Sequence, residues 1–418
     1  MLGPTIDMVW VGRLGAAAIA GVGVSGMAVM LLNSMMMSLN MGARAMIARF
    51  IGAGDEPGAN HVARQAFIII GFFAAIIVPV GLFLAEPILR VIGLEADVVA
   101  EGAAYMRILF VGAASMSFRM LTEGLMQASG DTRTPMWVNI AFRGFHIVLC
   151  PFLIFGWWIF PELGVRGAAF TNVFSQSLGL ILGLIALFSG RTRLRLTLKN
   201  FRVDPGIIWR IIKIAIPASV SGIQRGLGQL VITKFVIPFG TVAVAAHSLH
   251  QRVEMFILMP GMGLGMGGGV LAGQNLGAGK PDRSEKSVWT AMAVVEVWVV
   301  IMATVLLLWA EGVVSIFGPE PEVVEVTARF LRIAAIGVFV FSAEPVMMNC
   351  LNNVGDTIPP MVAILVSFWA VQVPVAYFLS QTGLGVYGVR WGMVIGMISS
   401  GLSLLIYFKL GRWKRKKV

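Results

Sequence analysis

The chain repeats its own sequence at a nearly constant offset. IGAGDEP at 51–57 returns as LGAGKPD at 276–282, and GDTRTPM at 130–136 returns as GDTIPPM at 355–361, both 225 residues later. LGVRG at 163–167 returns as LGVYG at 384–388, at an offset of 221. Repeats in this order predict two duplicated halves. Between the halves lies a basic stretch that contains Arg191, Arg193, Arg195, Lys199 and Arg202.

Composition places both halves in a membrane. The chain is 57% hydrophobic and 13% charged, with a mean hydropathy of +0.85. A spanning helix needs about 20 mostly apolar residues, and the alternation typical of strands is absent. We therefore expect an all-α polytopic membrane protein, with two six-helix lobes related by pseudo-twofold symmetry. The twelve apolar runs lie near 1–11, 16–40, 62–85, 102–128, 136–160, 166–189, 207–238, 242–272, 287–310, 326–350, 360–380 and 386–410.

The first apolar run is too short for a full span. A helix over 1–11 rises only about 16 Å, whereas the hydrocarbon core is about 30 Å thick. Either the native start lies upstream of Met1 or the first helix is abbreviated, and we expect the former.

Loop charge predicts the orientation. We divide the chain into an N-terminal lobe (1–189), a basic linker (190–205), a C-terminal lobe (206–411) and a basic tail (412–418). Basic segments stay on the cytoplasmic side, so we expect the linker and the tail there, in a multi-pass protein of the plasma membrane. Six spans per half place both lobes the same way up. The net charge of +11 then reflects topology rather than a nucleic-acid partner. We expect a monomer in the bilayer.

Motifs for enzyme chemistry are absent from the sequence. GLGMGG at 263–268 matches a dinucleotide-binding pattern, but it follows no strand and lies in an apolar run, where small residues let helices pack closely. We expect no enzymatic activity, no cofactor and no metal site. Cys150 and Cys350 are expected to be buried thiols, and His250 a packing residue. No polar segment is long enough for a nucleotide-binding domain, so any transport draws on an ion gradient or a separate subunit.

Polar residues recur at helical spacing inside the apolar runs. A charge at the centre of a span costs about 2.5–3.5 kcal/mol on insertion scales, so each one needs a partner, water or a function. Spacings of three or four residues place most members of each group on one helix face. We expect these faces to converge on a polar cavity between the halves. The groups are Asn139, Arg143, His146 and Cys150; Arg119, Glu123 and Gln127; His247, Gln251 and Glu254; Gln224, Arg225 and Gln229; and Glu344, Met348 and Asn352.

Structural roles compete with functional ones at these positions. Arg119 and Glu123 are four residues apart, so an ion pair within one helix is as plausible as a binding role. We expect Arg225 to neutralise Glu254 or Glu344, because an unpaired buried charge is costly. The charges that lie deep in the apolar runs roughly cancel in each half, which favours a paired network over a strongly charged tunnel.

Many motifs resemble those of the multidrug and toxic compound extrusion (MATE) family, in its prokaryotic DinF-like and NorM-like branches. They run in order from about residue 5 to about residue 400, at the spacing that the duplication requires. The resemblance implies two six-helix lobes around a central cleft, alternating access, and export in exchange for protons or sodium ions. The motifs are TIDMVWVGRLG (5–15), IGAGD, GDTRTPM and LGVRGAA in the first half, and IP (216–217), AAH (245–247), LAGQNLGAGKP (271–281), GDTIPPM and LGVYG in the second.

The resemblance also assigns residues for ion coupling in the first lobe. The first-helix acid of the family falls on Asp7, and its fifth-helix Asn and Asp fall on His146 and Cys150. A sixth-helix polar residue of the family falls on Thr171 or Asn172. Sodium prefers several oxygen ligands, whereas an imidazole titrates near neutral pH. The proton is therefore the favoured coupling ion, and sodium stays an alternative.

The second lobe departs from the family pattern. The seventh-helix Glu of the NorM-like branch falls on Arg225, and its tenth-helix acid falls near Phe341, with Glu344 one turn further. We therefore expect the usual cation site of that lobe to be absent.

Two functions from different classes remain open. The first is an antiporter that exports small amphipathic or cationic compounds. The alternative is a flippase for a lipid-linked or anionic precursor, which Arg119, Arg143 and Arg225 favour. The cancelling acidic residues and the family motifs count against it. A scaffold without transport would not need buried charges. The residues expected to line the cavity are Arg119, Glu123, Asn139, Arg143, Gln224, Arg225, Gln251, Glu254 and Glu344.

Overall fold

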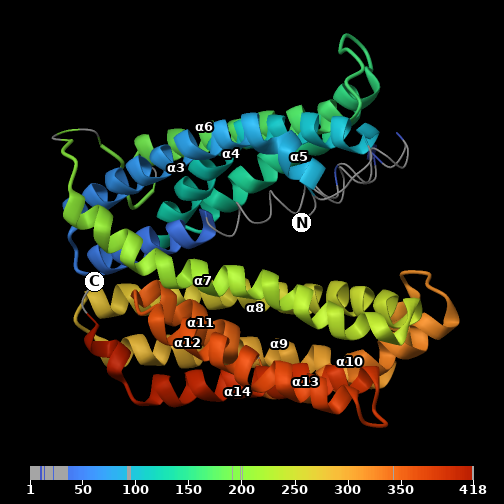
Figure 1. Cartoon of the computed structure of the whole chain (residues 1–418). Helices are drawn as coiled ribbons and strands as arrows, with labels where there is room; N and C mark the ends of the chain where they lie inside the picture. The colour runs from blue at the N-terminus through green and yellow to red at the C-terminus, as the bar shows by residue number, and fades with distance from the viewer. Residues whose placement is uncertain are drawn as a thin grey trace. The chain divides into compact units, whose positions relative to one another are not determined.

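The computed structural model describes residues 36–416, except 92–95, 191, 198, 200 and 342, together with residues 10, 11, 14 and 22. The regular structure in this part of the chain is helical (Figure 1). Within the described residues, a helix covers 36–52. The helices that follow are α3 (Glu56–Val91), α4 (Ala96–Ala128), α5 (Arg133–Phe155), α6 (Val165–Phe188), α7 (Pro205–Val236), α8 (Thr241–Gly277), α9 (Pro281–Ser315), α10 (Pro321–Phe341), α11 (Ala343–Val354), α12 (Ile358–Val366), α13 (Val373–Ser380) and α14 (Val386–Lys409), with short helical turns η2 (Ile237–Phe239), η3 (Ser367–Gln372) and η4 (Arg412–Arg415).

Among the described residues, nine helical segments are long and apolar enough to cross a membrane. They agree with the apolar runs predicted from residue 62 onward, which confirms the helical membrane fold. The run predicted near 326–350 is divided between α10 and α11. The run predicted at 1–11 falls outside the described residues, apart from Trp10 and Val11.

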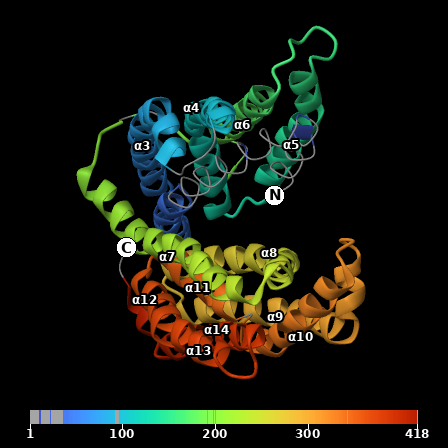
Figure 2. The same ribbon diagram turned by 45° about the vertical axis from the view of Figure 1, so that its right-hand side comes forward.

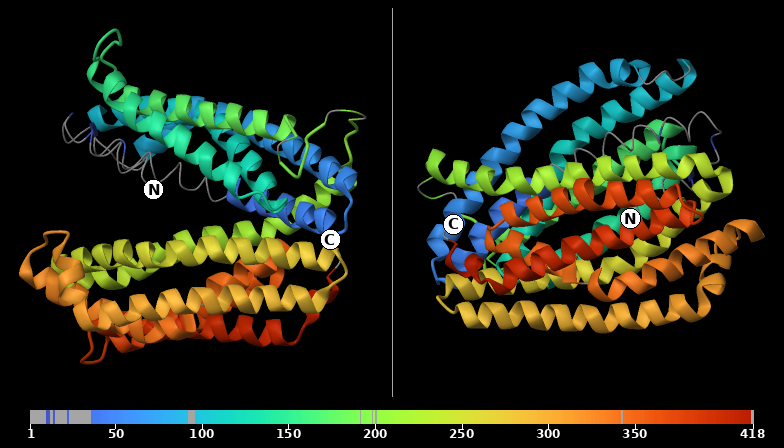
Figure 3. Two further views of the ribbon diagram at one scale, coloured as in Figure 1. Left: turned by 180° about the vertical axis from the view of Figure 1, so that it is seen from behind. Right: turned by 60° about the horizontal axis from the view of Figure 1, so that its bottom comes forward.

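The chain forms two compact units. The first contains Met1–Ile47 and Glu56–Ile212, and the second contains Ala48–Asp55 and Lys213–Val418. In the first unit α4 packs between α3 and α6, and α5 packs on α6 (Figure 2). In the second unit α8 packs on α9 and α11, while α10 packs on α9 and α14 (Figure 3). Buried aliphatic residues fill these helix contacts, with one such core formed by Val295, Val346, Leu351 and Leu404.

The repeated LGV-x-G motif has the same structure in both units. Gly164 precedes α6 with φ 55° and ψ −130°, and Gly385 precedes α14 with φ 53° and ψ −127°. A side chain is disfavoured at this positive φ, so glycine is required at both positions. The duplication inferred from sequence is therefore present in the backbone.

The linker is fastened to the first turns of α3. Asn60 donates from Nδ2 to the carbonyl oxygen of Arg195 at 2.6 Å, and Gln65 donates from Nε2 to that of Arg202 at 2.7 Å. The linker thus follows a fixed path along the first unit.

Asp204 ends the linker and begins α7. Its Oδ1 accepts hydrogen bonds from the backbone N–H groups of Gly206 at 2.9 Å and Ile207 at 3.1 Å, and its Oδ2 lies 3.2 Å from Nε2 of His61. The Ile207 N–H and then the His61 contact favour the charged carboxylate, so the pKa of Asp204 is lowered from its ordinary 3.8. The residue acts as an N-cap that also ties α7 to α3.

Helices of the second unit are irregular in mid-span. A π-helix at Ser367–Gln372 joins α12 to α13, directly before Pro374. Proline has no N–H to donate to the preceding turn, which releases a carbonyl group and favours this wider helix. Pro217 and Pro260 similarly interrupt the hydrogen-bond ladders of α7 and α8. These irregular segments surround the cavity described next.

Candidate functional site

A cavity of about 350 Å³ lies within the second unit. Its walls come from α7, α8, α11, α12, α14 and the π-helix. Ligand and ion sites of transporters commonly form where membrane helices are interrupted. The side chains that line it include Gln224, Arg225, Gln229, Glu254, Leu258, Met262, Glu344, Met348, Asn349, Ser367, Phe368, Gln372, Met393, Met397 and Ser400.

The uncharged part of the lining combines thioethers with amides. Four of the lining residues are methionines, whose flexible side chains adapt to ligands of different shape. Gln224 accepts a hydrogen bond at Oε1 from the Trp369 indole N–H at 2.9 Å. Its Nε2 is buried and has no hydrogen-bond partner among the described residues. An unsatisfied donor of this kind is costly, so a bound ligand or water that accepts from it would be favoured.

Three charged residues face the cavity. Arg225 interacts electrostatically with Glu344, which agrees with the pairing expected from sequence. Glu344 lies in the first turn of α11, where the helix dipole favours a negative charge. Glu254 is the second carboxylate, and its contact is with His250 of the same helix. The cavity therefore presents two carboxylates and one guanidinium.

A buried cluster stands behind Glu254. Nε2 of His250 lies 3.3 Å from Oε2 of Glu254, so the packing residue expected from the sequence also makes a polar contact. Arg390, which is 2% exposed, donates from one guanidinium nitrogen to Nδ1 of His247 at 2.6 Å. Arginine only donates, so His247 accepts at Nδ1 and is a neutral imidazole with its proton on Nε2. The Gln251 amide lies 2.7 Å from that Nε2.

Arg390 was missed in the sequence reasoning. Its guanidinium carbon lies 4.5 Å above the ring of Phe330, and its Nε has no hydrogen-bond partner among the described residues. The available signal was a charge deep inside the last apolar run, where any charge needs a partner. Its partner His247 is 143 residues away in the chain, so no local pattern connects the two.

The first unit contains a second polar cluster. Arg119 and Glu123 form the ion pair that their spacing predicted, and Glu123 also accepts from Nδ2 of Asn139. Arg119 donates to Oε1 of Gln176, a residue of α6 that the sequence reasoning did not single out. Helices α4, α5 and α6 are thus joined by one network. The guanidinium carbon of Arg143 lies 4.9 Å from the centre of the Phe142 ring.

The residues assigned to ion coupling are only partly described. Asp7 lies outside the described residues. His146 is buried in α5, and Asn172 is half-buried in α6. Thr171 donates its hydroxyl to the carbonyl oxygen of Gly167 at 2.8 Å, a bond within its own helix. The assignment of this group to coupling stays a prediction.

The comparison with known families gives one clear match. The MatE family model matches residues 1–152 and 217–378, which together make up most of the chain.

Known proteins resemble the chain over nearly its whole length. A probable multidrug resistance protein NorM from Thermotoga maritima is 25% identical over 427 residues, covering 100% of this chain and 90% of that protein. A FAD transporter from Shewanella oneidensis is 26% identical over 321 residues, covering 76% and 71%. A solved structure of a MOP superfamily transporter from Pyrococcus furiosus superimposes with a TM-score of 0.91 at 23% identity, covering 100% of this chain and 93% of that one. A different function has been suggested for that transporter from the reversed polarity of its binding pocket.

Proposed function

The chain belongs to the MatE family of membrane transporters, and we propose on that premise that it exports small amphipathic, often cationic compounds in exchange for protons. The observation that carries this proposal is the cavity of the second unit. It combines adaptable apolar walls with a small number of charged groups.

The neutral lining suits substrates of varied shape. Methionine side chains can repack around different apolar bodies at little cost, which is a property of promiscuous binding surfaces. Phe368 adds an aromatic face on which a delocalised cation can stack. Such a lining selects by size and polarity rather than by one fixed set of hydrogen bonds.

The charged lining favours a cation. Glu254 and Glu344 outnumber Arg225 at the cavity surface, and Arg390 lies outside the lining, behind His247. A cationic substrate can approach either carboxylate directly, whereas an anion would meet one guanidinium that already interacts with Glu344. The substrate cation therefore gains an attraction that a neutral analogue lacks.

Coupling to protons rests on the first lobe. His146 and Cys150 stand where the family has Asn and Asp, which removes oxygen ligands that sodium prefers and leaves Asp7 as the carboxylate at that position. Asp7 and His146 can each gain or lose a proton. In our proposal, protonation of this pair favours the state that releases substrate outward. Sodium coupling would need further oxygen ligands.

A second candidate is transport of an anionic compound, including a lipid-linked precursor. The similarity to a FAD transporter favours it, because FAD carries phosphate groups. Arg119 and Arg225 would then be the anion-binding groups. Their carboxylate partners Glu123 and Glu344 count against this reading.

Transport by the purified protein in lipid vesicles separates the two candidates. We expect uptake of a cationic dye, and little uptake of an anionic fluorophore of similar size. Glu344→Gln should reduce dye transport, while the control Glu320→Gln, at an exposed position before α10, should not. Preferential transport of the anion would favour the second candidate and contradict the first.

We also propose that the linker and tail face the cytoplasm of a monomeric plasma-membrane protein. Both native cysteines are buried, so single introduced cysteines report cleanly. A membrane-impermeant reagent added to intact cells should label Trp158→Cys, between α5 and α6, and spare Arg195→Cys. Labelling of Arg195→Cys from outside would reverse the orientation.

A further inference from the structure

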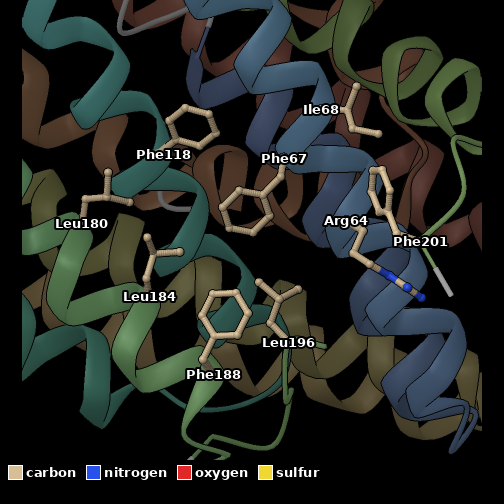
Figure 4. Close-up of a pocket in the computed structure, with 9 residues that line it drawn as sticks. All are labelled: Arg64, Phe67, Ile68, Phe118, Leu180, Leu184, Phe188, Leu196 and Phe201. Atoms are coloured by element: carbon tan, nitrogen blue, oxygen red, sulfur yellow. The ribbon is translucent and has the colours of Figure 1, made fainter. Parts of the chain in front are cut away.

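The first unit contains an apolar pocket of about 460 Å³ among α3, α4, α6 and the linker. The rings of Phe67, Phe118 and Phe188 surround one space, and Leu184 completes this wall (Figure 4). Among the lining side chains that the structure describes, Arg64 is the one that carries a charge. It stands at the rim beside Phe201 (Figure 4).

The linker side of the pocket is held in place by hydrogen bonds. Arg64 donates to the carbonyl oxygen of Lys199 at 2.5 Å, and the Leu196 N–H donates to the carbonyl oxygen of Leu187 at 3.0 Å. Leu196 is 4% exposed and lines the pocket from the linker. The pocket is therefore a defined part of the folded unit.

The rim of this pocket is strongly basic. Buried and exposed residues alternate along the linker, so that Leu194 and Leu196 face inward while the basic side chains between and beyond them face outward. No ion pair among the described residues neutralises Arg64 or these exposed cations, and the nearest linker acid, Asp204, already contacts His61. The exposed basic residues are Arg193, Arg195, Lys199 and Arg202.

We propose that this pocket binds an anionic phospholipid, with one acyl chain among the phenylalanines and the phosphate group against Arg64 and the basic linker. Apolar walls and a cationic rim at the end of a membrane helix bundle match the two parts of such a molecule. Basic pockets between spanning helices are the usual sites for anionic lipid headgroups. The bound lipid contacts the segment that joins the two units, so lipid composition affects how the linker is held.

Native mass spectrometry of the purified full-length protein tests this proposal. The protein is washed in detergent that contains equal amounts of phosphatidylglycerol and phosphatidylcholine, and the retained lipids are counted. We expect phosphatidylglycerol to be retained preferentially. Arg64→Gln should weaken that retention about fivefold, because one basic residue near a lipid surface gives about that factor. Arg166→Gln, an exposed arginine roughly 30 Å away at the other end of α6, should have no effect.

A second pair of variants tests the acyl site. Leu184→Trp fills the pocket and should reduce retention even though Arg64 is intact, while Ile181→Trp, on the exposed face of the same helix, should not. If Leu184→Trp does not fold, the Arg64 comparison decides the matter. Equal retention of the two lipids, equal behaviour of the two arginine variants, or displacement of phosphatidylglycerol by an equal concentration of inorganic phosphate would each overturn the proposal.

Discussion

The most direct structural prediction concerns Gly52 and Gly277. They are equivalent in the repeat, and they sit where the end of the 36–52 helix crosses the end of α8. An ideal Cβ at Gly277 would lie under 3.0 Å from the backbone of Arg49, and one at Gly52 under 3.0 Å from the backbone of Gln274. The Cβ at Gly277 meets Arg49, three residues before Gly52, and the Cβ at Gly52 meets Gln274, three residues before Gly277. A backbone neighbour cannot rotate away, so Gly277→Ala must push the two helix ends apart.

The size of the effect follows from that geometry. An extra methyl group in a well-packed contact costs typically about 1–3 kcal/mol. We expect Gly277→Ala to destabilise the protein within that range. Adding Gly52→Ala should lower the free energy of unfolding by less than Gly277→Ala alone does, because the helix separation caused by the first methyl group also makes room for the second.

Gly267→Ala is the matched control. It makes the same change in the same helix, but no atom lies within 4 Å of the added Cβ. Alanine is favoured over glycine in a helix by about 1 kcal/mol, so this variant should be slightly more stable than the wild type. Thermal unfolding in detergent measures all three variants. If Gly277→Ala is as stable as Gly267→Ala, the close crossing does not exist in the protein.

Two further predictions concern charged groups. The pKa of Asp204 is lowered, so the stability that this residue contributes is present above pH 3.8 and is lost as the pH falls through the lowered pKa. We therefore expect the linker of the wild type to resist protease throughout the neutral range. The linker of Asp204→Ala should be cut faster there. Arg390→Met removes the donor to Nδ1 of the buried His247 and should cost about 1–3 kcal/mol in unfolding experiments. Arg252→Met, at an exposed position of α8, should cost little, and equal losses would contradict the role of the cluster.

The sequence predicted the helical fold because its signals are local. Apolar runs separated by turn residues mark most of the helices, and the matching backbone angles of Gly164 and Gly385 confirm the duplication. The Arg119–Glu123 pair was predicted for the same reason, since both residues lie on one helix.

Contacts between helices were harder to predict. Arg390 and His247 meet across 143 residues, and Gln176 reaches Arg119 from another helix. The π-helix at Ser367–Gln372 was not predicted, because an apolar run indicates the length of a spanning helix but not the irregular turns within it.

Proton coupling is the central claim of the proposed function, and transport in sodium-free vesicles tests it most directly. With an imposed pH gradient, the wild type should accumulate a cationic dye, and so should the control His61→Ala, which changes a histidine near the linker. Asp7→Asn and His146→Ala should each lose most of this transport. A strict requirement for sodium, or full proton-driven transport in both variants, would contradict the claim.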